Sequence, residues 1–338
     1  MYCENDQILI NNLQKIRTGA VIILASEKGF NYTKIQATIQ QLPIPVVGAF
    51  FPGIIAQNEL HYTGYLLIHF QEPCEVHLFD SSTDVNLTEV KVAVKSGTGF
   101  VLLDGLADGN QDFLNELYYT FSQSFNFVGS GAGSLDLKQK ACIFDKEGIY
   151  ENKAIVIFIE SKVGLGIKHG YERIAGPIIA TSTNASRIHE LNWENALDVY
   201  AHILHKEADV LVDKSDFFSV SKGYPLGVSY QGHEDIVRDP ISCSSEGGIN
   251  CIDDIPENAA LYVLKGEPEK LIQAAKESCS EAMSFGYDNP SHCLLIDCVT
   301  RVLFLEDDFN FSCYFVTGRK NIEILVQIII WNALRKIG

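Results

Sequence analysis

The sequence predicts an α+β protein with mixed, largely antiparallel sheets flanked by helices. Short runs rich in Val, Ile, Leu, Phe and Tyr, bounded by Gly, Asp or Ser, recur along the chain and predict strands. Apolar residues at helical spacing are confined to a few segments between these runs. The strands between residues 220 and 264 are joined by turns too short for a crossover helix, so we expect them to pair antiparallel.

The first half of the chain begins with a predicted helix over Asn5–Ile16, where apolar residues fall at positions 8, 9, 13 and 16. A second helix, with Phe113 and Leu117 on its buried face, is expected to be capped by Asn110. The run Gly129–Gly133 imitates part of a dinucleotide fingerprint, but no amphipathic helix follows it, so a turn between strands is expected. The predicted strands of this half are Ala20–Leu24, Tyr62–Phe70, Val76–Phe79, Phe100–Leu103 and Ile155–Ile159.

The second half is predicted to contain two helices among strands. Asn192 is expected to cap a helix that buries Ala196, Tyr200 and Ile203, and Pro268 suits the first turn of the other helix. The predicted strands are Ile178–Thr181, Ala260–Leu264 and Leu294–Leu305. The apolar segment from residue 322 to residue 337 is interrupted by charged and amide side chains, so it predicts a buried closing strand or helix and no membrane insertion.

Length and composition indicate two domains. A chain of 338 residues with 46% apolar and 20% charged residues can bury a large core, and it is longer than one compact domain usually is. The boundary is predicted between Ala132 and Lys153, where Gly-rich and polar segments can connect two halves. We therefore expect domains over residues 1–145 and 146–338.

The charge of the chain excludes one class of partner. Its 43 acidic and 26 basic residues leave a formal net charge of −17, which repels phosphate backbones and anionic lipid headgroups. Nucleic acid is therefore not an expected partner.

The cysteines predict a reducing environment. The nine cysteines form no CxxC pair and no Cys/His ladder with zinc spacing, so no metal site is expected. They are scattered through apolar segments, as buried reduced thiols are. The first residues, MYCENDQ, lack the pattern of a secretory signal, and we expect a cytoplasmic protein.

Several motifs in the chain resemble those of one family in the same order. They are His169-Gly170, Ala180-Thr181, Glu190-Leu191-Asn192, Ala196 to Tyr200, Tyr224 to Gly227, Asp235 to Pro240 and His292 to Arg301. Together they resemble the FIST (F-box and intracellular signal transduction) family, and Val47 to Pro52 resembles a variant of its N-terminal half. The resemblance covers about the whole chain, except for the last thirty or so residues, which depart from it.

The resemblance implies two FIST halves packed together in a stand-alone sensory protein. It implies a protein that binds a small ligand and acts on a separate partner, such as a histidine kinase or a cyclic-di-nucleotide enzyme. No catalytic motif of the phosphoryl-transfer or GxSxG type is present, so the chain is not expected to be an enzyme.

The candidate ligand-binding residues are charged side chains within the matching motifs. On a straight strand Asp297 and Arg301 lie on one face, about 13 Å apart at ~3.3 Å per residue, so each needs another partner. Arg301 either binds a carboxylate or phosphate group of a ligand or pairs with an internal acid such as Asp239. An inward Arg238 beside Arg301 would form an anion pocket for an amino acid or another carboxylate, whereas an outward Arg238 would be only a solvated edge charge.

Two alternatives remain open at this stage. His169 can be a polar residue at a strand end or, as one branch of the family implies, an axial ligand in a haem-binding nitric oxide sensor. The cofactor is therefore unknown, with haem as the named possibility. Cys142 or Cys298 could serve a cysteine hydrolase, although the sequence pairs neither residue with a histidine.

Overall fold

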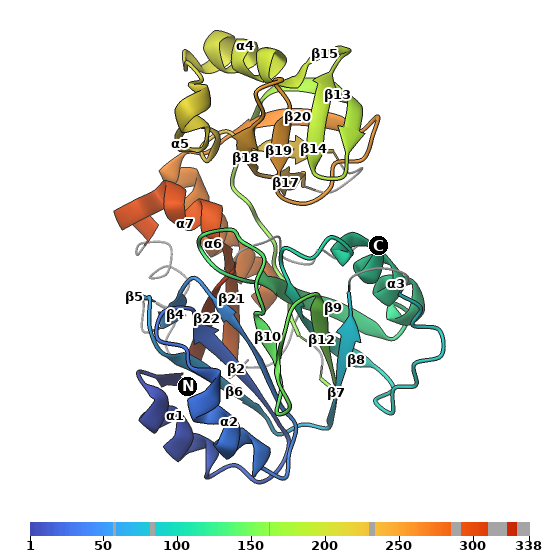
Figure 1. Cartoon of the computed structure of the whole chain (residues 1–338), viewed down its shortest axis with the longest axis vertical. Coiled ribbons are helices and arrows are strands. Elements are labelled where there is room, and N and C mark those ends of the chain that lie inside the picture. Colours follow the sequence, from blue (N-terminus) through green and yellow to red (C-terminus); the bar gives the residue numbers. More distant parts are fainter. Residues whose placement is uncertain are drawn as a thin grey trace. The chain divides into compact units, whose positions relative to one another are not determined.

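The computed structural model describes residues 1–56, 59–81, 85–161, 163–229, 234–284, 292–309 and 323–329. The chain forms two compact units (Figure 1). Unit 1 comprises Met1–Ile167, Glu281–Val299 and Thr317–Gly338, and unit 2 comprises Lys168–Ser280 and Thr300–Val316. The domain boundary at 145/146 stays a prediction, while the division into these units first falls at 167/168.

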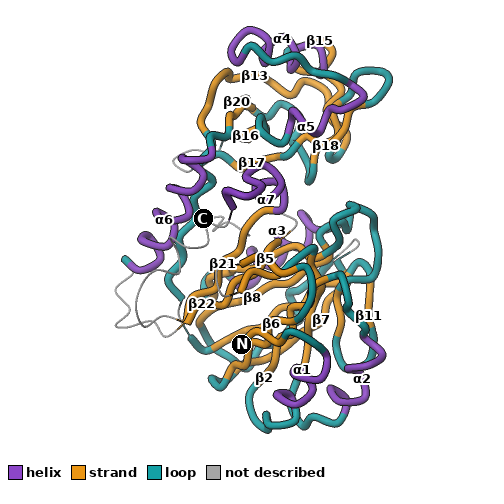
Figure 2. Tube along the Cα trace, turned by 90° about the vertical axis from the view of Figure 1, so that its left-hand side faces the viewer, coloured by secondary structure: helices purple, strands orange, loops and turns teal. Residues whose placement is uncertain are grey.

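The first sheet of unit 1 has the strand order β1-β6-β2-β3-β10-β11. Its strands are β1 (Tyr2–Cys3), β6 (Tyr65–Phe70), β2 (Ala20–Ser26), β3 (Val46–Phe51), β10 (Ile143–Phe144) and β11 (Ile149–Tyr150). Helix α2 (Tyr32–Gln40) connects β2 to β3, which run parallel. Helices α1 (Asp6–Leu13) and α2 lie side by side on one side of this sheet (Figures 1 and 2), and α1 buries Leu9 and Leu13.

The second sheet of unit 1 has the order β7-β12-β8-β9. Its strands are β7 (Cys74–Asp80), β12 (Lys153–Ile159), β8 (Gly97–Asp104) and β9 (Phe125–Ala132). Helix α3 (Asn110–Phe121) connects β8 to β9, which are also parallel. All other pairs in this sheet are antiparallel.

These two sheets repeat one motif. The order β1-β6-β2-β3 and the order β7-β12-β8-β9 have the same sequence of antiparallel, antiparallel and parallel pairings. In both, the parallel pair is connected by a helix, and the strand beside it comes later in the chain. No repeat is visible in the sequence, so only the topology indicates that unit 1 contains two copies of one fold motif.

The third sheet of unit 1 joins distant parts of the chain, in the order β21-β22-β4-β5. Its strands are β21 (His292–Cys298), β22 (Glu323–Ile329), β4 (Ile54–Ala56) and β5 (Glu59–His61). Strand β22 runs parallel to β21 and antiparallel to β4. The prediction of a closing strand or helix is confirmed as a strand at residues 323–329, and residues 330–338 lie outside the described part.

Unit 2 contains a sheet with the order β17-β16-β20-β13-β14-β19-β18, in which β15 also pairs with β14. The strands are β13 (Glu172–Asn184), β14 (Arg187–Leu191), β15 (Glu194–Asn195), β16 (Leu226–Val228), β17 (Ile236–Arg238), β18 (Pro240–Cys243), β19 (Ile249–Cys251) and β20 (Ala260–Lys265). Every strand pair in this sheet is antiparallel, as the short turns predicted. The α+β fold class with mixed, mostly antiparallel sheets is therefore confirmed.

Four helices complete the described chain, together with the 3-10 turns η1 (Lys214–Asp216) and η2 (Glu306–Asp308). They are α4 (Ala196–Ala208), α5 (Phe217–Ser221), α6 (Pro268–Met283) and α7 (Val299–Leu305). Pro268 opens α6 as predicted. Among the described residues, no helix is long and apolar enough to cross a bilayer.

Both predicted asparagine caps were wrong. Asn195, not Asn192, caps α4, since its side chain accepts the N–H of Asp198 at 3.4 Å. Asn192 instead has a positive φ in the preceding turn. Asn110 is the first residue of α3 and donates its side-chain N–H to the main-chain oxygen of Asp104.

The predicted turn at Gly129–Gly133 was also wrong, because residues 129–132 form the end of β9. A Cβ atom on Gly129 would lie 1.9 Å from the carbonyl oxygen of Val101. Gly129 therefore permits close approach of β9 to β8.

The single strand predicted over Leu294–Leu305 was wrong in its second half. Strand β21 ends at Cys298, and α7 begins at Val299. Val299, Val302 and Leu305 are all buried and follow a helical spacing, which outweighs the period-two pattern in this stretch. The strand geometry inferred for Asp297 and Arg301 therefore does not apply.

Candidate functional site

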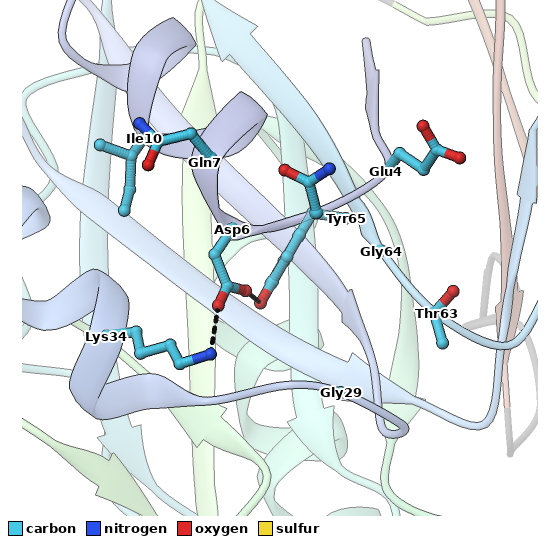
Figure 3. Close-up of a pocket in the computed structure, with 10 residues that line it drawn as sticks. Glu4, Asp6, Gln7, Ile10, Gly29, Lys34, Thr63, Gly64 and Tyr65 are labelled. Carbon is cyan, nitrogen blue, oxygen red and sulfur yellow. Dashed lines mark hydrogen bonds and ion pairs between the residues drawn. The ribbon is translucent and has the colours of Figure 1, made fainter.

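A cavity of about 700 Å³ lies in unit 1 beside the start of α1 (Figure 3). Its wall is formed by the first turn of α1, by α2 and by the segment that enters β6. The lining residues are Glu4, Asn5, Asp6, Gln7, Ile10, Gly29, Lys34, Thr63, Gly64 and Tyr65. Most of them carry polar groups, but the exposed wall is more apolar than polar, so the cavity suits a small molecule with both polar and apolar parts.

Asp6 is the centre of the polar network in this cavity. Asn5 caps α1 by accepting the N–H of Ile8, which places Asp6 in the first helical turn. The Asp6 carboxylate accepts a hydrogen bond from the Tyr65 hydroxyl and lies 3.0 Å from Lys34 Nζ. Figure 3 shows these three side chains pointing toward one another, with Glu4 farther away along the cavity.

The pKa values of the Asp6 carboxyl group and the Tyr65 hydroxyl group both depart from their ordinary values. Burial opposes ionisation of Asp6, but the hydrogen bonds from Tyr65 and Lys34 outweigh it and lower the pKa of Asp6. Burial and the neighbouring Asp6 carboxylate raise the pKa of Tyr65. Asp6 is therefore an acceptor and Tyr65 a donor near neutral pH.

The cavity can bind opposite charges at once. Glu4 and Asp6 supply carboxylates, while Lys34 supplies an ammonium group on a side chain that is 63% exposed. A zwitterion can place its amine near a carboxylate and its acid near Lys34. The lining residues include no cysteine or histidine.

Arg238 and Asp239, two sequence-predicted site residues, lie buried in unit 2 at the end of β17. The Arg238 guanidinium donates to the main-chain oxygens of Asp254 at 3.1 Å and Val237 at 3.2 Å, and it lies 4.0 Å from the Asp253 carboxylate. The inward orientation considered for Arg238 thus orders the loop after β19.

Arg238 and Asp239 both lie near the buried thiol of Cys251. Burial raises the pKa of Cys251 to about 12, while Arg238 lowers it and Asp239 raises it. Tyr200 of α4 closes the same region, since its hydroxyl donates to the main-chain oxygen of Tyr224 at 2.6 Å. Burial raises the pKa of Tyr200 as well.

Arg301 and Asp297 occupy different units. Arg301 is buried in α7 and donates to the main-chain oxygen of Leu271 in α6 at 2.6 Å. Asp297 is buried near the end of β21, and its carboxylate accepts the N–H of Cys298 at 2.9 Å. Because Arg238 and Arg301 each bond to a different segment, an anion pocket formed by both arginines stays a prediction.

The surroundings of His169 do not fit an axial haem ligand. Its Nδ1 accepts the N–H of Tyr171 at 2.9 Å, and its Nε2 faces the Glu234 carboxylate at 3.8 Å. The same Glu234 also accepts from the His169 main chain and pairs with Lys168 at 3.1 Å. Because Nδ1 accepts the hydrogen bond from Tyr171, the proton of the neutral ring lies on Nε2, so neither nitrogen offers a free lone pair to iron.

Cys142, one of the two cysteines considered as nucleophiles, is fully buried beside Asp104. Burial and the Asp104 carboxylate both raise the pKa of Cys142, which disfavours the reactive thiolate.

Among the described residues, no group of three or more His, Cys, Asp or Glu side chains can hold a metal ion.

Sequence reasoning missed the cavity and one buried ion pair. The cavity joins the start of α1 to residues 29, 34 and 63–65, and only the Asn-Asp helix start was visible as a signal. Asp235 is 4% exposed at its side chain and is held by both Nε and an Nη of Arg173. Arg173 also stacks 3.6 Å from the ring centre of Tyr262.

Comparison with known families finds two domain models along the chain. The FIST N domain matches residues 19–194, and the FIST C domain matches residues 196–314. The chain is a two-domain protein of the FIST family. FIST domains are generally associated with small-ligand sensing in signal transduction. No curated protein and no solved structure matches the chain.

Proposed function

We propose that this chain senses a small ligand in the cavity of unit 1 and acts on a separate signalling protein. The observation that carries the proposal is the Asp6–Tyr65–Lys34 network at a cavity of about 700 Å³, in a chain matched by both FIST domains. The cavity is of the size at which small molecules bind.

The ligand proposed is an amino acid or a related small zwitterion. Its ammonium group would lie near Glu4, where no ion pair occupies the carboxylate among the described residues. Its carboxylate would meet Lys34, whose exposed side chain can turn from Asp6 at low cost. The Tyr65 hydroxyl would keep Asp6 in place during this exchange.

A thermal-shift screen with the amino acids, putrescine, acetate and succinate tests the site. A ligand at 100 times its Kd should stabilise the fold by about 2.7 kcal/mol. Glu4→Gln and Lys34→Met should each abolish the shift. Lys153→Met, which removes a separate surface pair with Asp80, should leave it unchanged. A shift that survives both cavity substitutions would place the ligand elsewhere.

The partner proposed is a histidine kinase or a cyclic-di-nucleotide enzyme. The support is the family match and the charge of −17, which suits association with a protein partner better than with nucleic acid. The measurement is the activity of such a purified enzyme with the chain present, with and without ligand. An activity that ignores the ligand at saturation would contradict the proposed signalling role.

A further inference from the structure

The turn between β14 and β15 presents a tryptophan to solvent. Asn192 and Trp193 are its two central residues, because Leu191 pairs with Glu194 across the turn. Trp193 is 77% exposed, and the hairpin lies beside α4 (Figure 1). Such a side chain offers a large apolar surface at small cost in conformational entropy on binding.

The turn holds Trp193 in a conformation that favours glycine. Asn192 has φ 50° and Trp193 has φ 65°, the pattern of a two-residue hairpin turn in which Asn-Gly is the preferred pair. A bulky residue at positive φ is strained. The fold does not need the indole there, since most of it touches solvent.

The turn is fixed by hydrogen bonds to β13. The main-chain N–H of Trp193 donates to Thr181 Oγ1 at 2.8 Å, and the Asn192 side chain accepts the main-chain N–H of Ile179 at 2.9 Å. The Asn192 N–H also donates to the main-chain oxygen of Ile179 at 2.8 Å. The main chain that carries the indole is therefore already ordered, so a partner need not order the turn when it binds.

Exposed carboxylates surround this tryptophan. Glu190 and Glu194 lie on the same hairpin, Asp198 lies in the first turn of α4, and Glu246 is next to the hairpin because its main-chain oxygen accepts from Asn195. None of these four carboxylates forms an ion pair within the described residues. This surface thus combines one exposed apolar side chain with an acidic rim of four carboxylates that have no ion-pair partner among the described residues.

We infer that Trp193 and this rim dock a protein partner that has an apolar pocket within a basic surface. The acidic rim favours basic groups around the pocket and repels anionic lipids. A second copy of this chain fits poorly, because its own charge is −17. The inference rests on the proposed function in one respect: the protein that docks at Trp193 is taken to be the signalling partner proposed above.

Trp193→Gly tests the docking without damage to the fold. Glycine adopts this φ freely, so the variant should melt at or above the wild-type temperature. Loss of a central aromatic anchor should weaken partner binding about 30-fold or more. Tyr119→Ser is the matched control, since it removes another aromatic that is 80% exposed, in unit 1, and should leave the affinity unchanged.

The partner is identified by a photo-cross-linking amino acid placed at position 193 in the native cells, with position 119 as the control. The cross-linked protein is then purified, and its Kd is measured against wild type, Trp193→Gly and Glu194→Lys at several salt concentrations. We expect an adduct specific to position 193, weaker binding by both variants, and a Kd that rises with salt. No specific adduct, or equal affinity of Trp193→Gly and wild type, overturns the inference.

The outcome can be separated from that of the proposed ligand site. The ligand-induced thermal shift of the Trp193→Gly variant is measured in the absence of any partner, and it should equal that of the wild type. A normal shift without partner docking removes only the Trp193 surface. A lost partner with no ligand shift in the wild type would instead remove the proposed sensory function as well.

Discussion

Asp104 is a buried carboxylate whose partners are uncharged. It accepts the N–H groups of Asn152 at 2.8 Å and Leu106 at 3.2 Å, and the Gln139 side chain donates to it as well. Burial raises the pKa of Asp104 above 3.8, although these donors oppose the shift. Between 3.8 and the raised pKa, the unfolded chain has lost the proton that the folded chain keeps.

We therefore predict that Asp104 lowers the stability of the fold as pH rises from about 4 through its raised pKa. Asp104→Asn has no proton to lose. The free energy of unfolding of the variant, minus that of the wild type, should therefore increase across this pH range, so that the variant becomes the relatively more stable protein. Urea denaturation at each pH measures it, and a difference that stays constant with pH would contradict the assignment.

Tyr200 predicts a graded response to substitution. Its ring is fully buried, and its hydroxyl is bonded to the main-chain oxygen of Tyr224. Tyr200→Phe should cost about 1–3 kcal/mol, because that buried oxygen loses its donor. Tyr200→Asp should give no folded protein, since it buries an unpaired charge. Tyr119→Phe, at an exposed position, should change the free energy of unfolding by less than ~0.5 kcal/mol.

The sequence could identify charged residues within the family motifs, but not their partners. It left open whether Arg238 faces inward and whether Arg301 meets a ligand or an internal acid, and both side chains are buried. Arg238 donates to a main-chain oxygen 16 residues away, and Arg301 donates to one 30 residues away. Any residue type supplies a main-chain oxygen, so no sequence pattern indicates which one an arginine will meet.

At the level of elements, β8 and β9 depend on a glycine contact. A methyl group at Gly129 would meet the Val101 backbone, which cannot move aside as a side chain can. Gly129→Ala should therefore destabilise unit 1 by about 3 kcal/mol or more. Gly148→Ala is the control, since only the Tyr150 side chain lies near that position, and it should cost far less. Similar denaturation midpoints for the two variants would contradict the predicted packing.

Arg173 connects three strands of unit 2. It starts from β13, pairs with Asp235 just before β17 and stacks on Tyr262 of β20. Arg173→Ala leaves Asp235 buried without its counter-charge. Because the arginine side chain is 44% exposed, we expect a loss of about 2–3 kcal/mol, below the range for fully buried pairs.

Chemical denaturation measures this loss. Lys206→Ala removes a surface pair with Glu207 and should leave the stability unchanged. Arg173→Lys should recover only part of the loss, since an ammonium group cannot reproduce the two-point contact. Full recovery would mean that charge alone holds the strands.

Element type followed from periodicity wherever one pattern dominated. The segment after Leu294 carries both patterns, and its apolar positions at 299, 302 and 305 decided the outcome in favour of a helix. Asn192 resembles a helix cap in sequence, but it is placed in a hairpin turn by hydrogen bonds to Ile179. Such contacts come from a neighbouring strand and are invisible in a single sequence.

For the whole molecule, we predict that reduction leaves stability unchanged. Cys3, Cys74, Cys142, Cys243 and Cys251 form no disulfide, and Cys3, Cys142 and Cys251 are buried. The melting temperature should therefore be the same with and without dithiothreitol. A lower melting temperature in the reducing agent would reveal a bridge that supports the fold.

The fold class was predictable from the alternation of strands and helices, while the repeat within unit 1 was not. The two sheets share strand order and direction, yet β2 reads Ala-Val-Ile-Ile-Leu-Ala-Ser and β8 reads Gly-Thr-Gly-Phe-Val-Leu-Leu-Asp. The same strand order and direction are thus filled by different apolar residues in the two sheets. Different apolar residues of suitable volume can fill the same arrangement, so the repeat is visible only in the topology.

The third sheet of unit 1 has a consequence for synthesis on the ribosome. Strand β4 leaves the exit tunnel early, yet its partner β22 lies about 270 residues later and emerges only after all of residues 168–280. Until then, one edge of β4 has no partner and can pair with other nascent chains. A shortened chain that stops before residue 323 would carry this exposed edge permanently, and we expect it to aggregate.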